Sequence, residues 1–329
     1  MAVFTQVAIE ELNHFLSQYN IGELYGYEEI KEGRENTNYA LLTKKYSNSQ
    51  PKKYILTLYE KRVKQQDLPY FIALLEHLNR NNVPCPIPVY ARDGKVLQRL
   101  CGKTAVIMSF LPGLCSSDNS VTDCESLGKA VAKMHVSCLD FHLYRTNDMS
   151  LKSWIHLANI THEYAHALRP GLNNILKSEI NYLLKNWPCN LPTGIIHADL
   201  FPDNVFFLNS QISGLFDFYF ACNDFLVYDL AICINAWCFE TDYSFNINKT
   251  KALLRGYQQF RSLNNAEISA IPVLVRGSAM RFLLTRLYDK YTYNSNTNVT
   301  PKNPIDYLYR LQFHQNSEGL EAYGLDKKV

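Results

Sequence analysis

The chain has 329 residues, of which 47% are hydrophobic and 19% are charged. This is enough apolar material for a folded core, so intrinsic disorder is excluded as a description of the whole chain. The 33 Lys and Arg residues against 31 Asp and Glu leave a net charge of +2, which is no global basic field, and we expect no nucleic-acid partner.

Residues 1–109 predict a small N-terminal lobe that covers a nucleotide and is built on a sheet of short strands. The apolar periodicity predicts helices over 5–19 and 67–82 and strands over 39–43, 54–59 and 104–110. Residues 89–97 predict a hairpin that turns at Asp93-Gly94. The stretch Leu111-Pro112-Gly113 then ends the sheet.

Residues 110–329 predict a larger, mainly helical lobe for catalysis and substrate binding. Helical spacing covers 123–139, 151–168, 173–187, 225–239, 248–262 and 271–291. Among these helices lies one compact β island, 194–220, which is rich in Ile, Phe, Val and Leu. We therefore expect an α+β fold of two lobes joined by a short hinge.

The β island contains a spaced set of polar side chains. His197-x-Asp199-x-x-x-x-Asn204 is followed by Asp217, which ends an apolar strand, and then by Asp229. Phosphoryl transfer needs a carboxylate that orients the attacking hydroxyl and a magnesium ion that offsets charge on the phosphates. An amide and a second carboxylate at neighbouring strand ends supply hard oxygen ligands for such an ion. The pattern therefore favours a phosphotransferase; the alternative is that these Asp and Asn residues only satisfy turns.

This segment resembles the catalytic loop of aminoglycoside-phosphotransferase-like kinases, and more narrowly that of the homoserine kinases built on the same fold. The loop resemblance is carried by Gly194-Ile-Ile-His-Ala-Asp-Leu-Phe-Pro-Asp-Asn-Val-Phe-Phe. Further matching stretches are Tyr54-Ile-Leu-Thr-Leu-Tyr-Glu-Lys-Arg, Gly214-Leu-Phe-Asp-Phe-Tyr-Phe-Ala-Cys-Asn-Asp, Tyr228-Asp-Leu-Ala-Ile-Cys-Ile-Asn-Ala-Trp-Cys-Phe-Glu and Arg276-Gly-Ser-Ala-Met-Arg-Phe-Leu-Leu-Thr-Arg-Leu-Tyr-Asp. They spread over nearly the whole chain, and they narrow the resemblance to homoserine kinases.

The resemblance implies a bilobal protein-kinase-like fold, with a small antiparallel-sheet lobe and a larger mainly helical lobe. It implies ATP and Mg²⁺ as cofactors, and phosphorylation of L-homoserine to O-phospho-L-homoserine in threonine biosynthesis. Asp199 takes the role of the base, and Asn204 and Asp217 take those of magnesium ligands. His197 and Asp229 are expected to support the loop through a hydrogen bond between them.

The expected nucleotide site departs from the family at one position. Kinases usually carry a lysine on the third strand, and here that register offers Thr57. Lys61 or Arg62 is the candidate for its replacement, with Glu76 on the following helix as the partner. The alternative is that both cations are ordinary solvated charges.

The remaining nucleotide contacts are expected from two segments. Residues 32–38 lie between two predicted strands, and with only Gly33 in the loop the backbone amides and the side chains of Asn36 and Asn38 would contact the phosphates. Ser109 and Leu111 follow a buried strand and would face the adenine as a hinge. A polar hairpin turn and a plain interlobe linker are the alternatives.

Three arginines fall on one predicted helix, and a planar guanidinium suits the carboxylate of an amino-acid substrate. Arg276, Arg281 and Arg286 are five residues apart, a step that turns a helix by about 140°, so the three do not share one face. Arg276 and Arg281 are the candidates for the substrate carboxylate, because Arg286 has Asp289 in position to pair with it.

Two further candidates for the substrate site follow Asp217. Asp224 is the candidate for the substrate ammonium, although lone loop acids are commonly solvated. Tyr219 is either a cleft wall or a core aromatic.

The cysteines and the hydropathy pattern bear on location. Nine cysteines, an odd number without any C-x-x-C spacing, indicate reduced thiols in a cytoplasmic protein. The first residues do not form a secretory signal, and no uncharged apolar run reaches about 18 residues, so we expect no membrane partner.

Two other functions stay open at this point. The acceptor can be an aminoglycoside, choline or another small amino alcohol instead of homoserine. The chain can also be a nucleotide-binding pseudokinase, which the missing strand lysine favours and the intact Asp199, Asn204 and Asp217 oppose.

Overall fold

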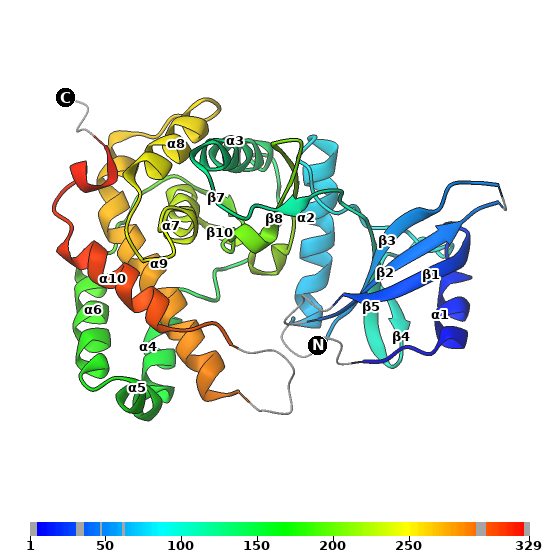
Figure 1. Cartoon of the computed structure of the whole chain (residues 1–329), viewed down its shortest axis with the longest axis horizontal. Coiled ribbons are helices and arrows are strands. Elements are labelled where there is room, and N and C mark those ends of the chain that lie inside the picture. Colours follow the sequence, from blue (N-terminus) through cyan, green and yellow to red (C-terminus); the bar gives the residue numbers. More distant parts are fainter. Residues whose placement is uncertain (1–4, 31–35, 47, 61–62, 294–300, 326–329) are drawn as a thin grey trace. The chain divides into compact units, whose positions relative to one another are not determined.

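The computed structural model describes residues 5–30, 36–46, 48–60, 63–293 and 301–325 (Figure 1). These residues divide into two compact units between Pro112 and Gly113. Unit 1 contains the N-terminal sheet, and unit 2 contains the loop 197–204 and the helices that surround it.

Unit 1 is an antiparallel sheet with two helices. The strands run in the order β1 (Glu23–Ile30), β2 (Thr37–Lys44), β3 (Lys52–Leu58), β5 (Lys103–Ser109) and β4 (Gln98–Leu100), and the helices are α1 (Ile9–Leu16) and α2 (Leu68–Arg80). Along β2 buried side chains alternate with partly exposed ones, as in a strand with one face on a core. Leu12 and Phe15 of α1 share that core with Leu41, Leu56 and Ile107 of the sheet.

One local prediction for unit 1 is corrected, and one strand was not located from the sequence. The turn at Asp93-Gly94 is present, since Gly94 N donates to Ala91 O at 3.0 Å, but no hairpin of paired strands flanks it. The hairpin forms one step later, where β4 and β5 pair and Leu100 faces Lys103. The bounds of strand β1, which precedes residues 32–38, were not predicted, because none of its side chains is buried and it lacks an apolar alternation.

Unit 2 is mainly helical. Its helices are α3 (Val121–Ser137), α4 (Leu151–Ile160), α5 (His162–Leu168), α6 (Leu172–Asn186), α7 (Leu226–Trp237), α8 (Ile247–Gln258), α9 (Asn265–Tyr291) and α10 (Ile305–Asn316). The β island forms two small sheets, one of β7 (Thr193–Ile196) with β10 (Cys222–Phe225), and one of β6 (Leu114–Cys115), β8 (Val205–Leu208) and β9 (Gln211–Leu215). Short 3₁₀ turns lie at Gln65–Asp67 in unit 1, and at Pro202–Asn204, Phe218–Phe220 and Glu321–Tyr323 in unit 2.

The core of unit 2 is built around α7. All of its residues are buried, and it packs against α3, α8 and α9 (Figure 1). Helix α9 is long and apolar enough to cross a membrane by length and composition, but 72% of its most apolar window is buried inside the protein, as in a core helix. It begins six residues earlier than predicted, because Asn264 and Glu267 form a capping box and Pro272 is tolerated in its third turn.

Helices α3 and α8 cross at very close range. A Cβ atom on Gly128 would lie 2.0 Å from the carbonyl oxygen of Leu253, and one on Gly256 would lie 2.1 Å from that of Glu125. Only glycine leaves room for the two backbones at these positions. The close crossing brings Tyr257 of α8 to His135 of α3, a contact that reaches the 197–204 loop.

Candidate functional site

The loop 197–204 connects β7 to β8 and carries the predicted His197, Asp199 and Asn204. Val205, the first residue of β8, pairs with Leu215, the last residue of β9. Asn204 and Asp217 therefore lie at the same open end of this hairpin, and Phe216 N donates to Asn204 O at 3.2 Å. The hairpin thus brings together the two strand ends that carry Asn204 and Asp217.

Asn204 is buried and holds Asp199. Its Nδ2 donates to the backbone oxygen of Asp199 at 2.8 Å and to the carboxylate oxygen Oδ2 at 3.2 Å. These bonds orient the Asp199 carboxylate from behind the loop. Since Nδ2 is used in this way, the amide oxygen of Asn204 is the atom that remains for a cation.

Two residues of the site have left-handed backbones. Ala198 and Asp217 each have a φ of 64°, although neither is glycine. Side chains make this conformation unfavourable, and it persists only where surrounding contacts hold it. Ala198 directly precedes the predicted base Asp199, and Asp217 is itself a predicted magnesium ligand.

Asp229, in the first turn of α7, holds the start of the loop. Its fully buried carboxylate accepts hydrogen bonds from the backbone N–H groups of His197 and Ala198, both at 2.9 Å. The ring Nε2 of His135 lies 3.2 Å from Asp229 Oδ2. Burial opposes the charge of Asp229, but the hydrogen bond and charge of His135 and the contacts with His197 outweigh it, so the pKa of Asp229 lies below its usual value.

The predicted contact between His197 and Asp229 is therefore corrected in its atoms. The backbone of His197, not its ring, bonds Asp229, and ring Nε2 donates to Phe216 O at 3.0 Å. This ring links the loop to the residue that precedes Asp217. Sequence reasoning missed His135 as the ring partner of Asp229, because it lies in a helix without any motif around it.

Two carbonyl groups of the loop are bonded by side chains from α9 and α7. Arg281 Nη1 donates to Ala198 O at 2.7 Å, and Trp237 Nε1 donates to Leu200 O at 2.8 Å. Arg281 is only 1% exposed, so its guanidinium supports the loop from within the core. This corrects the expectation that Arg281 holds the substrate carboxylate.

The other predicted substrate residues are also engaged. Arg276 donates Nε and Nη2 to the carboxylate of Glu179 at 2.7 and 2.6 Å, so its charge is already compensated. Asp224 accepts from Asn147 Nδ2 and from the backbone of Phe225, both at 2.7 Å, and burial raises its pKa. Tyr219 is half-buried two residues after Asp217.

The predicted nucleotide residues belong to unit 1. Gly33, Lys61 and Arg62 lie outside the described residues. Asn36 Oδ1 accepts from Glu60 N at 3.3 Å, and Asn38 Oδ1 accepts from Thr57 Oγ1 at 2.7 Å, across directly paired strand positions. Thr57, which stands at the usual lysine position, is thus tied to the sheet.

Glu76 and the hinge candidates have other partners within unit 1. Glu76 accepts a short hydrogen bond from the Tyr90 hydroxyl. Ser109 Oγ accepts from Ile87 N at 2.9 Å, and Leu111 follows two residues beyond the end of β5. Nucleotide roles for these residues stay predictions.

Two histidines of unit 2 are buried in the neutral form. Burial lowers the pKa of His197 to about 4 and that of His314 to about 3. His314 lies 3.1 Å from both the Asn235 amide oxygen and the Tyr323 hydroxyl. In the unfolded chain each ring takes up a proton near its usual pKa of about 6.5. Their stabilising contribution is therefore complete above about pH 6.5 and is lost as the pH falls towards the folded values.

We expect the free energy of unfolding to fall by about 2 kcal/mol per pH unit between about pH 5.5 and 4.5 from these two rings. Urea titrations across this range measure the slope. His314→Gln removes one titrating ring and should reduce the slope by about 1 kcal/mol per pH unit. The exposed His156 provides the matched control, and a His314→Gln slope equal to that of His156→Gln contradicts the prediction.

The chain is similar to known phosphotransferases over most of its length. A model of the phosphotransferase enzyme family matches residues 26–263. The chain is 49% identical over 326 residues to a homoserine kinase of Rhodopseudomonas palustris strain BisB5, covering 99% of this chain and 98% of that protein. It is 48% identical over 325 residues to a homoserine kinase of Rhizobium johnstonii, covering 99% of both.

Solved structures show the same fold at low sequence identity. An amicoumacin kinase in complex with AMP-PNP and Ca²⁺ matches with a TM-score of 0.70 at 14% identity, covering 94% of each chain. A microcompartment-associated aminopropanol kinase matches with a TM-score of 0.66 at 15% identity, covering 98% of this chain and 100% of that one. The predicted α+β, protein-kinase-like fold is confirmed.

Proposed function

Since this chain belongs to the homoserine kinases of the phosphotransferase enzyme family, we propose that Asp199 is the residue that takes the proton from the substrate hydroxyl. The enzyme transfers a phosphoryl group from ATP to the hydroxyl of L-homoserine and forms O-phospho-L-homoserine. Near 48% identity over almost the whole length of several homoserine kinases is the observation that carries this function. The product is an intermediate of threonine biosynthesis.

The geometry of the loop supports the role of Asp199. Its carboxylate is half-exposed and held by Asn204 Nδ2, so it presents an oriented oxygen while the backbone behind it is fixed. A carboxylate in this setting orients the hydroxyl towards the phosphoryl group and accepts its proton as the new bond forms. His197 and Asp229 act through the backbone of the loop and are positioning residues.

Asn204 and Asp217 would hold Mg²⁺. Among the residues that the structure describes, no group of three His, Cys, Asp or Glu side chains is arranged to hold a metal ion. One amide oxygen and one carboxylate at the same hairpin end fit Mg²⁺, which takes few protein ligands and completes its shell with phosphate oxygens and water. When bound, this ion supplies positive charge against the phosphates of ATP.

The competing acceptors are separated by one assay. A coupled measurement of ADP release compares L-homoserine with L-serine, choline and an aminoglycoside under identical conditions. We expect kcat/KM for L-homoserine to exceed the others by at least about a hundredfold. A higher value for choline or the aminoglycoside would show a different acceptor, and no turnover with any of them would show a pseudokinase.

The location in the cell stays a prediction. All nine cysteines are free, which fits the reducing conditions of the cytoplasm. The substrate is a small molecule, and we expect neither a nucleic-acid nor a membrane partner.

A further inference from the structure

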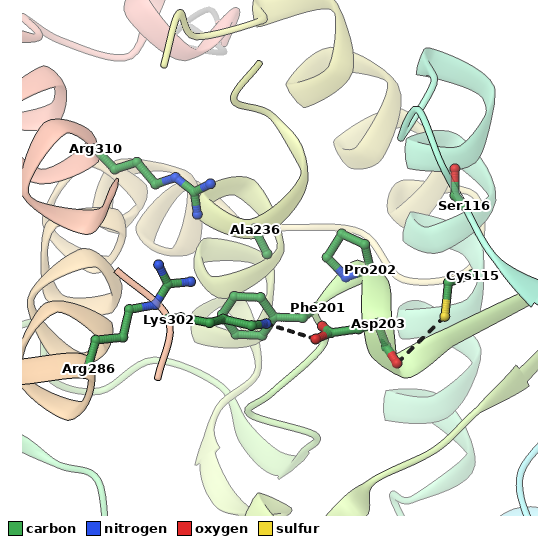
Figure 2. A pocket seen from close by; sticks show the side chains of 9 residues that line it. All are labelled: Cys115, Ser116, Phe201, Pro202, Asp203, Ala236, Arg286, Lys302 and Arg310. Atoms are coloured by element: carbon green, nitrogen blue, oxygen red, sulfur yellow. Dashed lines mark hydrogen bonds and ion pairs between the residues drawn. The ribbon is translucent and has the colours of Figure 1, made fainter. Parts of the chain in front are cut away.

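A pocket of about 380 Å³ lies in unit 2, against the second half of the 197–204 loop. One side is formed by the residues that follow Asp199 in the loop, and another by cations from α9, α10 and the segment between them (Figure 2). Its lining includes Phe201, Pro202, Asp203, Arg286, Lys302 and Arg310. The volume suits a small molecule of the size of an amino acid.

The cations of this pocket are unequally compensated. Arg286 Nη1 pairs with Asp306 at 2.9 Å, and Lys302 pairs with Asp203 at 2.8 Å. Arg310 has no carboxylate partner among the described residues, and its Nε is buried without a hydrogen-bond partner there. Three cations against two carboxylates leave one positive charge, and it resides on the Arg310 side.

The two guanidinium groups face one another. Figure 2 shows the guanidinium ends of Arg286 and Arg310 pointing toward one another across the pocket. They pack on the same ring, that of Tyr307, at 4.5 and 4.6 Å from its centroid. Burial lowers the pKa of Arg286, and the charge of Arg310 lowers it further. Two positive charges that pack on the same ring repel each other, and an anion bound between them would offset this repulsion.

One wall of the pocket belongs to the loop that carries the predicted base. Phe201 follows Asp199 by two residues, and its ring contacts that of Tyr307 with centroids 6.3 Å apart. Burial raises the pKa of the Tyr307 hydroxyl, and the nearby Asp199 carboxylate raises it further. Tyr307, on which Arg286 and Arg310 pack, therefore lies within electrostatic reach of the Asp199 carboxylate.

We propose that Arg310, together with Arg286, binds the α-carboxylate of L-homoserine in this pocket. A guanidinium offers two parallel donors to a carboxylate, which gives both affinity and orientation. Lys302 neutralises Asp203 and Asp306 neutralises Arg286, so the positive charge of Arg310 is the one left for the carboxylate of the substrate. The inference rests on the proposed function for the identity of the substrate.

The test compares two acceptors and two variants. 3-Aminopropan-1-ol is L-homoserine without its carboxylate and keeps the reacting hydroxyl. Arg310→Met removes the charge but keeps an apolar stem on Tyr307, and Arg310→Lys keeps the charge without the paired donors. We expect Arg310→Met to lower kcat/KM for L-homoserine by at least about thirtyfold and that for 3-aminopropan-1-ol by less than about threefold. For L-homoserine, kcat/KM of Arg310→Lys should lie between that of the unaltered enzyme and that of Arg310→Met. In both variants KM for ATP should stay within about twofold of the unaltered value.

Arg255→Met is the matched control, because Arg255 is an exposed arginine of α8 that pairs with Glu125. This variant should leave kcat/KM for both acceptors unchanged. Equal losses on both acceptors in Arg310→Met overturn the proposal, and a rise in KM for ATP alone shows that the pocket holds a phosphate instead.

Calorimetric titration separates this proposal from the proposed function. Loss of L-homoserine affinity in Arg310→Met and Arg310→Lys, with thermal stability retained, supports the carboxylate site even if the unaltered enzyme fails to phosphorylate L-homoserine. Unchanged affinity in both variants overturns the carboxylate site even if phosphorylation is fast.

Discussion

Asp199→Asn is expected to lower kcat by at least about a hundredfold while ATP still binds. The substituted amide keeps an oxygen in place for the Asn204 Nδ2 hydrogen bond of 3.2 Å, so the loop keeps its shape. It loses the ability to accept a proton from the substrate hydroxyl at neutral pH. Turnover is measured with L-homoserine at saturating ATP, and nucleotide affinity is measured by calorimetry.

The control for Asp199→Asn is thermal stability, because the backbone contacts that fix the loop do not involve the Asp199 carboxylate. An unchanged unfolding temperature together with the loss of kcat supports the assigned role. Near-normal turnover by this variant would remove Asp199 from the mechanism.

The second large effect is expected at Asp217. Asn is the suitable replacement, because it tolerates the left-handed backbone at φ 64° and removes only the anionic oxygen. Asp217→Asn should lower kcat by about a hundredfold at ordinary Mg²⁺ and raise the Mg²⁺ concentration for half-maximal rate by about tenfold. The rate is measured across a magnesium series at fixed ATP.

Asp242→Asn serves as the comparison, since Asp242 is an exposed loop carboxylate of unit 2 that accepts from Ser244. Its magnesium series should coincide with that of the unaltered enzyme. If Asp217→Asn also follows that curve, Asp217 is no ligand of the ion.

The parts of the site that lie within one hairpin were predictable from the sequence. Asn204 and Asp217 flank two short apolar strands, and an antiparallel pair of strands places their outer flanks together. The protein-kinase-like fold was also predicted, because the loop motif and the other matching stretches resemble a known family. Local order along the chain is enough information for such features.

Contacts between distant helices were not predictable in this way. A spacing of five residues shows that Arg276, Arg281 and Arg286 point in different directions from their helix. It does not show which of them contacts the 197–204 loop. Arg281 lies under Ala198, 83 residues away in the chain, and Arg276 meets Glu179, which is 97 residues away. Such partners are set by tertiary packing, which a single sequence does not encode in any local pattern.

Helix α10 was missed for a related reason. It begins directly after a polar segment, and its buried residues Tyr307, Leu308 and Leu311 form a short stripe that propensity alone does not separate from a loop. The pocket cations Lys302 and Arg310 lie just before and within this helix, so the proposed carboxylate site could not be found at the sequence level.

The bonded backbone of residues 197–200 has a consequence for how substrate is received. The amides of His197 and Ala198 and the carbonyls of Ala198, Asp199 and Leu200 all have hydrogen-bond partners within the protein. The loop therefore loses little conformational entropy when homoserine arrives, because that loss occurs once, during folding. Preorganisation of this kind favours substrate binding at Asp199 without a rearrangement of the loop. Helices α7 and α9 supply the side chains that hold the loop, so they influence kcat/KM although they lie away from the reacting atoms.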